Sequence, residues 1–414
     1  MTMDDDAIKI SFIGDVMCEK PLLNAARTRD GLYDFDDVFV NMRDTFKKSD
    51  YIVGNLETVC AGEEKEYTNH LYSFNTPDSF IESIAKSGIH MVTTANNHCL
   101  DRGLSGLKRT ISVLDNNNLE HIGTYSSPEE QEEPFIKNFN GVKVSFLNYT
   151  YGTNLKINGV VINENEKHNV NLLTSQRRDI ELVKKKKEEK SFKSSLFKGL
   201  FKIISIEQWI KFKKMLGLTH NRAYSDDDVN LDNDYLEKIK LDIKKAKKNS
   251  DYVVVCMHSG GQFNKKPGKF TEYMMEFMAE NGVDLVVGTH PHVVQKHEKI
   301  GDMLAIYSIG NFNISPGSVY LINENLPDYG IMLHLYLKNT SNGVKLDRIT
   351  FSVLKMHEDA KGYVRTYPVD EFMNQLSNKK EKEILLDNVR KIYNLFTNEN
   401  VEEVNLQKEY NLPL

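Results

Sequence analysis

Five short polar motifs recur along the chain, each placed where an apolar run ends. In chain order they are Gly14-Asp15, Gly54-Asn55-Leu56-Glu57, Asn96-Asn97-His98, His258 and His290-Pro291-His292. Aspartate, glutamate, asparagine and histidine are the side chains that bind hard and borderline divalent metals. Because α/β proteins gather their chemistry where strands end, this shared placement predicts a metal site at one edge of a sheet.

Each motif also has an ordinary structural interpretation when it is taken alone. Asp15 can cap a turn, and Glu57 can be a solvated loop residue. The asparagines tolerate left-handed backbone, and a histidine such as His258, at the end of a very apolar strand, is usually structural. The proline between His290 and His292 fixes φ, so both imidazoles can reach one pocket. The five motifs in series, rather than any one of them, favour the metal site.

The chemistry follows from the residue types. Two divalent ions held by such ligands would lower the pKa of a bridging water, and the resulting hydroxide could attack phosphorus. His98 would then be free to protonate the leaving alkoxide. Asp101 can orient His98 from behind, or it can cap a helix that begins near residue 104. The sequence contains neither a phosphate-binding P-loop motif nor a G-x-S-x-G nucleophile motif.

The elements that must position these residues alternate between strand and helix patterns, which predicts an α/β fold. Seven apolar runs are expected to be strands: Lys9–Ile13, Tyr51–Val53, Met91–Thr94, Val142–Leu147, Tyr252–Met257, Val283–Val287 and Leu304–Ile309. Helices are expected at 35–47, at 77–86 with Thr76 as N-cap, at 104–118, at 232–248 with Asp232 as N-cap, and at 271–281. Antiparallel strands are expected over 329–355, and amphipathic helix over 371–398.

Residues 184–214 differ in composition from the rest of the chain. They hold eleven lysines against three glutamates, a local charge of +8, together with the only tryptophan. A basic, aromatic-rich amphipathic helix can lie on an anionic membrane surface. A packed lid, an oligomer contact and a disordered linker are the alternatives. We therefore expect a main domain over 1–370, a basic helical insertion at 175–225 within it, and a C-terminal helical segment at 371–414.

Composition excludes some classes of protein. The formal net charge of −6 does not indicate nucleic-acid binding. No Cys-x-x-Cys pair is present, so a zinc ribbon is excluded, and the four cysteines can either pack beneath the site or act as thiolate ligands or redox groups: Cys18, Cys60, Cys99 and Cys256. No membrane-spanning run and no signal peptide are seen, which predicts the cytoplasm, with peripheral contact at the inner membrane face as an alternative.

As a set, the motifs resemble the CapA family of capsule or poly-γ-glutamate biosynthesis proteins, whose domain is similar to calcineurin-like metallophosphoesterases. The resemblance covers roughly residues 8–315. It rests on Ile13-Gly14-Asp15-Val16-Met17, Gly54-Asn55-Leu56-Glu57, Ala95-Asn96-Asn97-His98-Cys99-Leu100-Asp101-Arg102-Gly103, Gly288-Thr289-His290-Pro291-His292-Val293-Val294-Gln295 and Tyr307-Ser308-Ile309-Gly310-Asn311-Phe312. It implies a four-layer αββα sandwich of the metallophosphoesterase type, with two facing sheets.

The resemblance also implies roles for individual residues. His98 falls at the position of the catalytic acid, and the metal-binding positions are Asp15, Glu57, Asn97, His258, His290 and His292. The cofactor expected there is one or two divalent ions of manganese, zinc or iron.

Two departures from the family pattern matter. Met17 stands where the broader phosphoesterases have the histidine of Asp-x-His. A site that binds one ion is therefore an alternative to a site that binds two. Residues 258–262 read His-Ser-Gly-Gly-Gln where the family tends to have His-Trp-Gly-x-Glu, which changes the pocket wall.

Two functions are therefore expected from the sequence. The first is a metal-dependent, phosphoesterase-like hydrolase in the synthesis of a cell-envelope polymer, with that polymer or a phosphoester as substrate. The second is a non-catalytic assembly or scaffold subunit of a polymer synthase that keeps the fold. An anionic membrane surface is a possible partner of residues 184–214.

Overall fold

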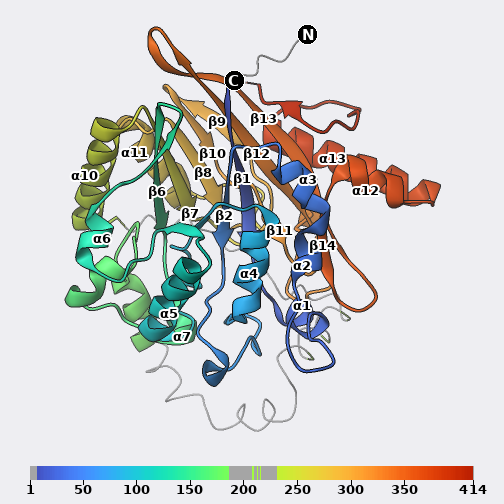
Figure 1. The fold of residues 1–414 in the computed structure, drawn as a ribbon, viewed down its shortest axis with the longest axis horizontal. Helices are drawn as coiled ribbons and strands as arrows, with labels where there is room; N and C mark the ends of the chain where they lie inside the picture. Colours follow the sequence, from blue (N-terminus) through green and yellow to red (C-terminus); the bar gives the residue numbers. More distant parts are fainter. Residues whose placement is uncertain (1–6, 186–207, 209–211, 213–214, 216–230, 414) are drawn as a thin grey trace.

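The computed structural model describes residues 7–185, 208, 212, 215 and 231–413, and its strands form two sheets (Figure 1). The nine-stranded sheet runs in the order β14-β13-β12-β1-β2-β3-β4, with β11 beside β1 and β15 beside β13. Its strands are β1 (Ile8–Val16), β2 (Tyr51–Leu56), β3 (Met91–Thr93), β4 (Glu120–Ile122), β11 (Asn311–Asn313), β12 (Tyr329–Thr340), β13 (Gly343–Glu358), β14 (Val364–Pro368) and β15 (Tyr410–Asn411).

The second sheet has six strands in the order β5-β6-β7-β8-β10-β9. They are β5 (Phe135–Phe139), β6 (Val142–Thr150), β7 (Tyr252–His258), β8 (Leu285–Thr289), β9 (His297–Ile300) and β10 (Met303–Ile306). In both sheets the central strands are parallel: β1, β2, β3 and β4 in the first, and β6, β7, β8 and β10 in the second. The C-terminal ends of β1, β2, β7 and β8 carry four of the five motifs.

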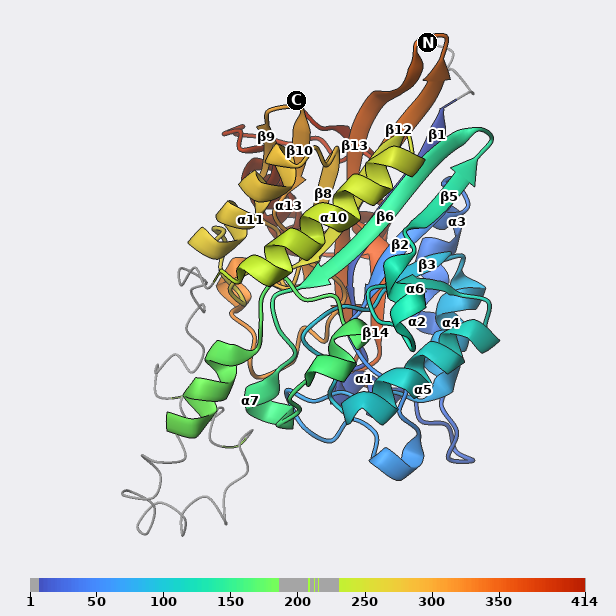
Figure 2. The same cartoon turned by 90° about the vertical axis from the view of Figure 1, so that its left-hand side faces the viewer.

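The α-helices lie outside the sheets. Those that lie wholly within the described residues are α1 (Lys20–Ala25), α2 (Asp36–Phe39), α3 (Arg43–Phe46), α4 (Asp78–Ser87), α5 (Gly103–Asn116), α6 (Pro128–Glu132), α7 (Leu155–Asn158), α10 (Asn233–Asn249), α11 (Lys269–Glu280), α12 (Val369–Gln375) and α13 (Lys379–Thr397). Figure 2 shows α10 lying across β6 on the outer face of the second sheet.

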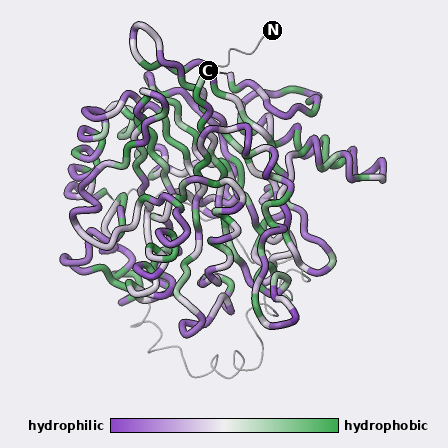
Figure 3. Tube along the Cα trace, viewed as in Figure 1, coloured by the Kyte–Doolittle hydropathy of each residue, from purple (hydrophilic) through white to green (hydrophobic). Residues whose placement is uncertain are grey.

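Three apolar clusters separate four layers. The largest lies between the sheets and joins residues such as Phe12 and Leu333 of the first sheet to Phe146 and Val254 of the second. Another packs α1–α4 against the outer face of the first sheet. The third packs α10 and α11 against the outer face of the second. Figure 3 shows the hydrophobic residues concentrated on the inner strands. The predicted αββα sandwich is confirmed.

Side-chain alternation along the strands produces these layers. In β2, Tyr51 and Val53 belong to the cluster between the sheets, whereas Ile52 between them belongs to the outer cluster. Successive residues of a strand point to opposite faces, so a strand buried on both faces reads as a continuous apolar run. This is why the short apolar runs of the sequence predicted strands correctly.

Some predicted boundaries are wrong. Thr76 is not the N-cap of α4, because the helix begins at Asp78 and Pro77 occupies the N-cap position without a side-chain cap. A proline there is extended and supplies a fixed φ rather than a hydrogen bond. Asp232 does cap α10, where its side chain accepts from the Asp234 N–H. The strand predicted to end at Leu147 continues to Thr150, because β7 pairs with it to that residue.

The chain after β14 packs against the rest of the molecule. Leu385, Val389 and Phe396 of α13 belong to the cluster between the sheets, and β15 pairs with β13. The basic segment 184–214 lies outside the described residues, apart from 184, 185, 208 and 212. Over the described part of the chain, no helix is long and apolar enough to cross a membrane.

Candidate metal centre

Asp15 reaches the site because β1 is irregular at Gly14. The register between β1 and β2 shifts between Ile13 and Asp15, which is a β-bulge, and a bulge redirects the next side chain. The backbone of Gly310 approaches so closely that a Cβ on Gly14 would lie 1.9 Å from the Gly310 oxygen. Only glycine fits there. The Asp15 carboxylate, fully buried, accepts a 2.7 Å hydrogen bond from the Asn55 amide.

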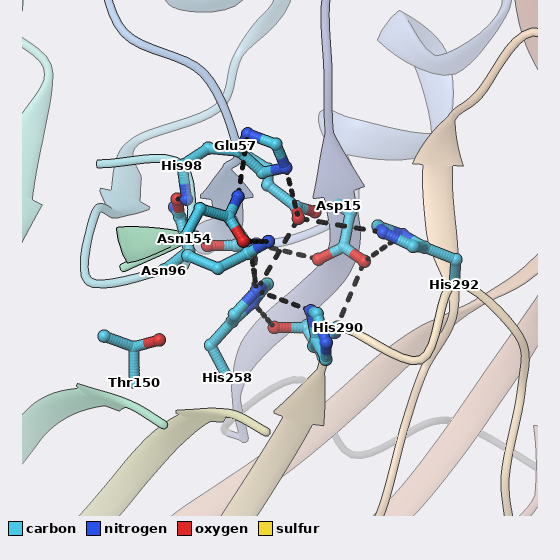
Figure 4. A network of polar contacts seen from close by, with 12 residues as sticks. Asp15, Glu57, Asn96, His98, Thr150, Asn154, His258, His290 and His292 are labelled. Atoms are coloured by element: carbon cyan, nitrogen blue, oxygen red, sulfur yellow. Dashed lines mark hydrogen bonds and ion pairs between the residues drawn. The ribbon is translucent and has the colours of Figure 1, made fainter. Parts of the chain in front are cut away.

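Glu57 follows β2 and lies at the centre of the site (Figure 4). Its Oε1 is 3.6 Å from His258 Nε2, 3.7 Å from His292 Nε2 and 3.8 Å from His98 Nε2. The side chain is 0% exposed, and neither carboxylate oxygen has a hydrogen-bond partner. Glu57 is therefore not the solvated loop residue that one interpretation of the sequence allowed.

The three predicted histidine ligands come from the ends of β7 and β8. His258 Nδ1 lies 3.0 Å from Thr289 Oγ1, so its Nε2 faces the site. That Nε2 is 3.1 Å from His290 Nδ1, and His292 Nδ1 is 3.1 Å from an Asp15 oxygen. His290 and His292 have φ of 101° and 57°. Left-handed backbone is costly for such residues and is concentrated at functional sites.

These side chains form two groups that share Glu57. Glu57, His258 and His290 make one group, and Asp15, Glu57 and His292 make the other; within each, the candidate ligand atoms lie within 4.8 Å of one another. All five residues are buried. A carboxylate shared by two such groups is the arrangement that holds two neighbouring cations.

The electrostatics of the site fit a divalent cation. Burial, with the Asp15 carboxylate nearby, raises the pKa of Glu57 well above its ordinary value. Burial and neighbouring imidazoles lower the pKa of His258 and His290 well below theirs, so both are neutral, the form that binds metals. A buried carboxylate without donors costs free energy unless a cation compensates it. The donor set therefore fits the expected group.

The two adjacent asparagines have different surroundings. Asn96 bonds to its neighbours rather than to the two groups. Its amide donates to the Leu56 carbonyl at 2.7 Å and to Asn55 Oδ1 at 3.2 Å, and its oxygen accepts from the His98 N–H. Asn97 points its Oδ1 at His258 Nε2, 2.7 Å away. Asn97, the predicted ligand of the pair, therefore borders the first group.

His98 lies beside the two groups rather than within either. Its Nδ1 is 2.6 Å from Asp101 Oδ2, and its ring stacks on Phe74 with centroids 4.3 Å apart. The same Asp101 oxygen accepts from the Phe74 N–H at 2.6 Å. Asp101 does not cap α5, whose N-cap position is Arg102 without a side-chain cap. Of the two interpretations of Asp101, the structure supports the one in which it orients His98.

Several polar residues at the site were not predicted as site residues from the sequence. Asn55 is the most connected, since its amide group contacts Asp15, His258, Thr93 and Asn96. Its place inside the second motif was a signal, but sequence alone does not show its partners. Thr289 and Asn154 are further examples. Asn311, by contrast, was expected from the sequence to line the same edge, and its Oδ1 lies 2.9 Å from His292 Nδ1.

The cysteines pack as small apolar residues. All four are buried and unpaired, and none belongs to a ligand group among the described residues. Burial raises the pKa of Cys18 and of Cys256 to about 12, so these thiols stay protonated at neutral pH. Met17 is likewise buried in the outer apolar cluster of the first sheet and supplies no ligand atom of the usual kind.

The chain is similar in sequence to known proteins of bacterial capsule synthesis. The profile of a family described as bacterial capsule synthesis protein PGA_cap matches residues 9–315. The capsule biosynthesis protein CapA of Bacillus anthracis is 24% identical over 76% of this chain and 61% of its own length. The PGA biosynthesis protein CapA of Bacillus subtilis is 21% identical over 86% of this chain and 74% of its own length. The chain thus spans about three fifths of the first relative.

Two solved structures show a more distant likeness to the chain. The calcineurin-like phosphoesterase YfkN from Bacillus subtilis has a TM-score of 0.40 and 11% identity, covering 84% of this chain and 90% of that one. A 5'-nucleotidase from Candida albicans has a TM-score of 0.38 and 9% identity, covering 93% of this chain and 58% of that one.

Proposed function

The chain belongs to the bacterial capsule synthesis protein PGA_cap family, and we propose that it acts in cell-envelope polymer synthesis as a metal-dependent, phosphoesterase-like hydrolase. The two Bacillus relatives, which are named as capsule or PGA biosynthesis proteins, support the biological setting. The hydrolase part of the proposal rests on the geometry of the site.

One observation carries it. The Glu57 carboxylate is fully buried without a donor and is shared by two ligand groups, with imidazole nitrogens 3.6–3.8 Å away. A fold that leaves such a group unpaired is arranged to receive cations. Asp15, Glu57 and His292 would hold one ion, and Glu57, His258 and His290, with Asn97 beside them, the other.

Bound divalent ions would supply an activated water and neutralise charge on a phosphoryl group. The chain's own residues have three further tasks. His98, 3.8 Å from Glu57 and outside both groups, would deliver a proton to the leaving oxygen. Asp101 holds the His98 ring by Nδ1, which leaves Nε2 facing the site. Phe74, stacked on that ring, fixes its plane and excludes water from one face.

The test combines metal analysis with a substrate screen. The purified protein is expected to contain a divalent metal and to turn over a phosphomonoester, a phosphodiester or a γ-glutamyl polymer. Asp15→Asn and His290→Ala should each abolish that turnover, because each removes a ligand. His121→Ala, at a histidine paired with Asp115 away from the site, is the matched control. Turnover that persists in both ligand variants would refute the proposal.

A scaffold subunit is the second candidate, and Met17 favours it. The residue at that position is buried in an apolar cluster, so the first motif contributes one ligand side chain where the broader phosphoesterases have two. A scaffold predicts no ester turnover, with partner binding unchanged by His98→Ala. Turnover lost on His98→Ala would exclude it.

A further inference from the structure

Asn154 contacts both the predicted ligand Asn97 and the predicted acid His98. Figure 4 shows Asn154 beside His98. Its Oδ1 accepts a hydrogen bond from Asn97 Nδ2 at 3.2 Å, and its Nδ2 lies 3.5 Å from His98 Nδ1. Asn97 and His98 follow β3 of the first sheet, whereas Asn154 follows β6 of the second. The contact therefore joins loops from the two sheets at the metal centre.

Asn154 lies in a strained backbone conformation. It occupies the N-cap position of α7 with φ 50° and ψ 33°, in the left-handed region. Asparagine tolerates this region better than most residues, and glycine adopts it freely. The loop is fixed around it, because the preceding Thr153 accepts hydrogen bonds of 2.6 Å from Gln176 at its hydroxyl and from Asn158 at its carbonyl.

The Asn97 amide has two possible orientations, and only one is useful at a metal centre. A divalent cation binds the carbonyl oxygen and repels the NH2 group. The oxygen of Asn154 can only accept, so it selects the orientation in which Asn97 Nδ2 points to Asn154. Asn97 Oδ1 then points to His258 Nε2, 2.7 Å away, on the side of the metal centre.

We propose that Asn154 is a positioning residue that fixes the Asn97 amide with its oxygen toward the metal centre. This inference rests on the proposed function, because it assigns Asn97 a place beside a bound ion. Outer-shell partners of this kind contribute about 10- to 100-fold in metal affinity. We expect a loss near the lower end of that range, since the ligand it orients is neutral.

The experiment measures Mn²⁺ affinity by calorimetric titration of the full chain after chelator treatment, so no substrate is needed. Asn154→Ala should weaken Mn²⁺ binding about tenfold. Asn154→Gly should weaken it equally, although glycine relieves the left-handed strain, because both variants lack the acceptor. Asn154→Asp, which keeps an acceptor oxygen, should bind at least as tightly as the wild type. Thermal unfolding of each metal-free variant checks that it is folded.

A double-mutant cycle separates positioning from a general structural effect. If Asn154 acts through Asn97, adding Asn154→Ala to Asn97→Ala should change Mn²⁺ affinity no further. An Asn154→Ala protein with wild-type affinity, or a Gly variant that regains it, overturns the inference and leaves the proposed function standing. A wild-type protein that binds no Mn²⁺, Zn²⁺ or Fe²⁺ overturns both.

Discussion

Replacing Glu57 with glutamine is expected to change stability and metal affinity in opposite directions. In the metal-free protein the Glu57 carboxylate is buried without donors and lies near the Asp15 carboxylate, which raises its pKa. Removing that charge with an isosteric amide should stabilise the metal-free fold by on the order of 2 kcal/mol, because unpaired buried charges cost several kcal/mol. The same change removes the ligand that both groups share, so metal binding should weaken strongly.

The expected change in melting temperature follows from the length of the chain. A chain of 414 residues unfolds with an entropy of about 0.9 kcal/mol/K if it follows the average per residue. The metal-free Glu57→Gln protein should therefore melt about 2 °C above the wild type. Mn²⁺ at 100 times its Kd stabilises by about 2.7 kcal/mol per site, which raises the wild-type Tm by about 3 °C per ion. The variant should gain less than about 1 °C at the same concentration.

The assay is scanning calorimetry of chelator-treated proteins, before and after Mn²⁺ is added. Glu19→Gln is the matched control, since Glu19 is an equally buried glutamate whose carboxylate accepts from the Ser315 N–H, Ser318 and Tyr320. Burial raises the pKa of Glu19 as well, but three donors offset part of that effect. Its neutralisation should therefore give a smaller gain in Tm than neutralisation of Glu57. A Glu57→Gln protein that is no more stable than the wild type without metal, or that gains as much from Mn²⁺, would refute the reasoning.

The remaining predictions concern other parts of the molecule. His98→Ala should lower kcat by about 10²- to 10⁴-fold with Mn²⁺ affinity unchanged; a large loss of affinity would show that His98 is a ligand instead. Asp101→Asn should lower kcat at least tenfold in steady-state kinetics with little change in KM, and a change in KM alone would contradict its orienting role. Burial lowers the pKa of His334 to about 3, below its unfolded value, so the free energy of unfolding should fall as pH drops from about 6.5 toward 3. His334→Asn should weaken this pH dependence when it is measured by urea unfolding, and an unaltered pH dependence would contradict the prediction. Co-sedimentation of the full chain with anionic vesicles should weaken steeply with salt if residues 184–214 dock on membranes, and salt-insensitive binding would reject docking.

The strands and the convergence of the motifs could be predicted because they depend on local pattern. Apolar runs such as Tyr252–His258 form buried parallel strands, and the polar residue after each run falls at the same sheet edge. What the sequence did not reveal depends on contacts between distant segments. The close approach of the Gly310 backbone to Gly14, and the turn that brings Asn154 to Asn97, leave no spacing signal.

The prediction that Thr76 is the N-cap of α4 was wrong for a different reason. Thr76 and Pro77 fit a common pattern for the start of a helix, but an extended Pro77 delays that start by one residue. Local propensity fixes a helix boundary only to within a residue or two.

Each ligand group draws on both sheets: Glu57 and Asp15 belong to the nine-stranded sheet, and His258, His290 and His292 to the six-stranded one or the loop after it. Ions bound there would cross-link the two sheets of the sandwich. A cell short of metal would then hold copies that open more readily at this end, and proteases would remove them first. The lifetime of the protein in the cell would therefore depend on how much of the metal is available.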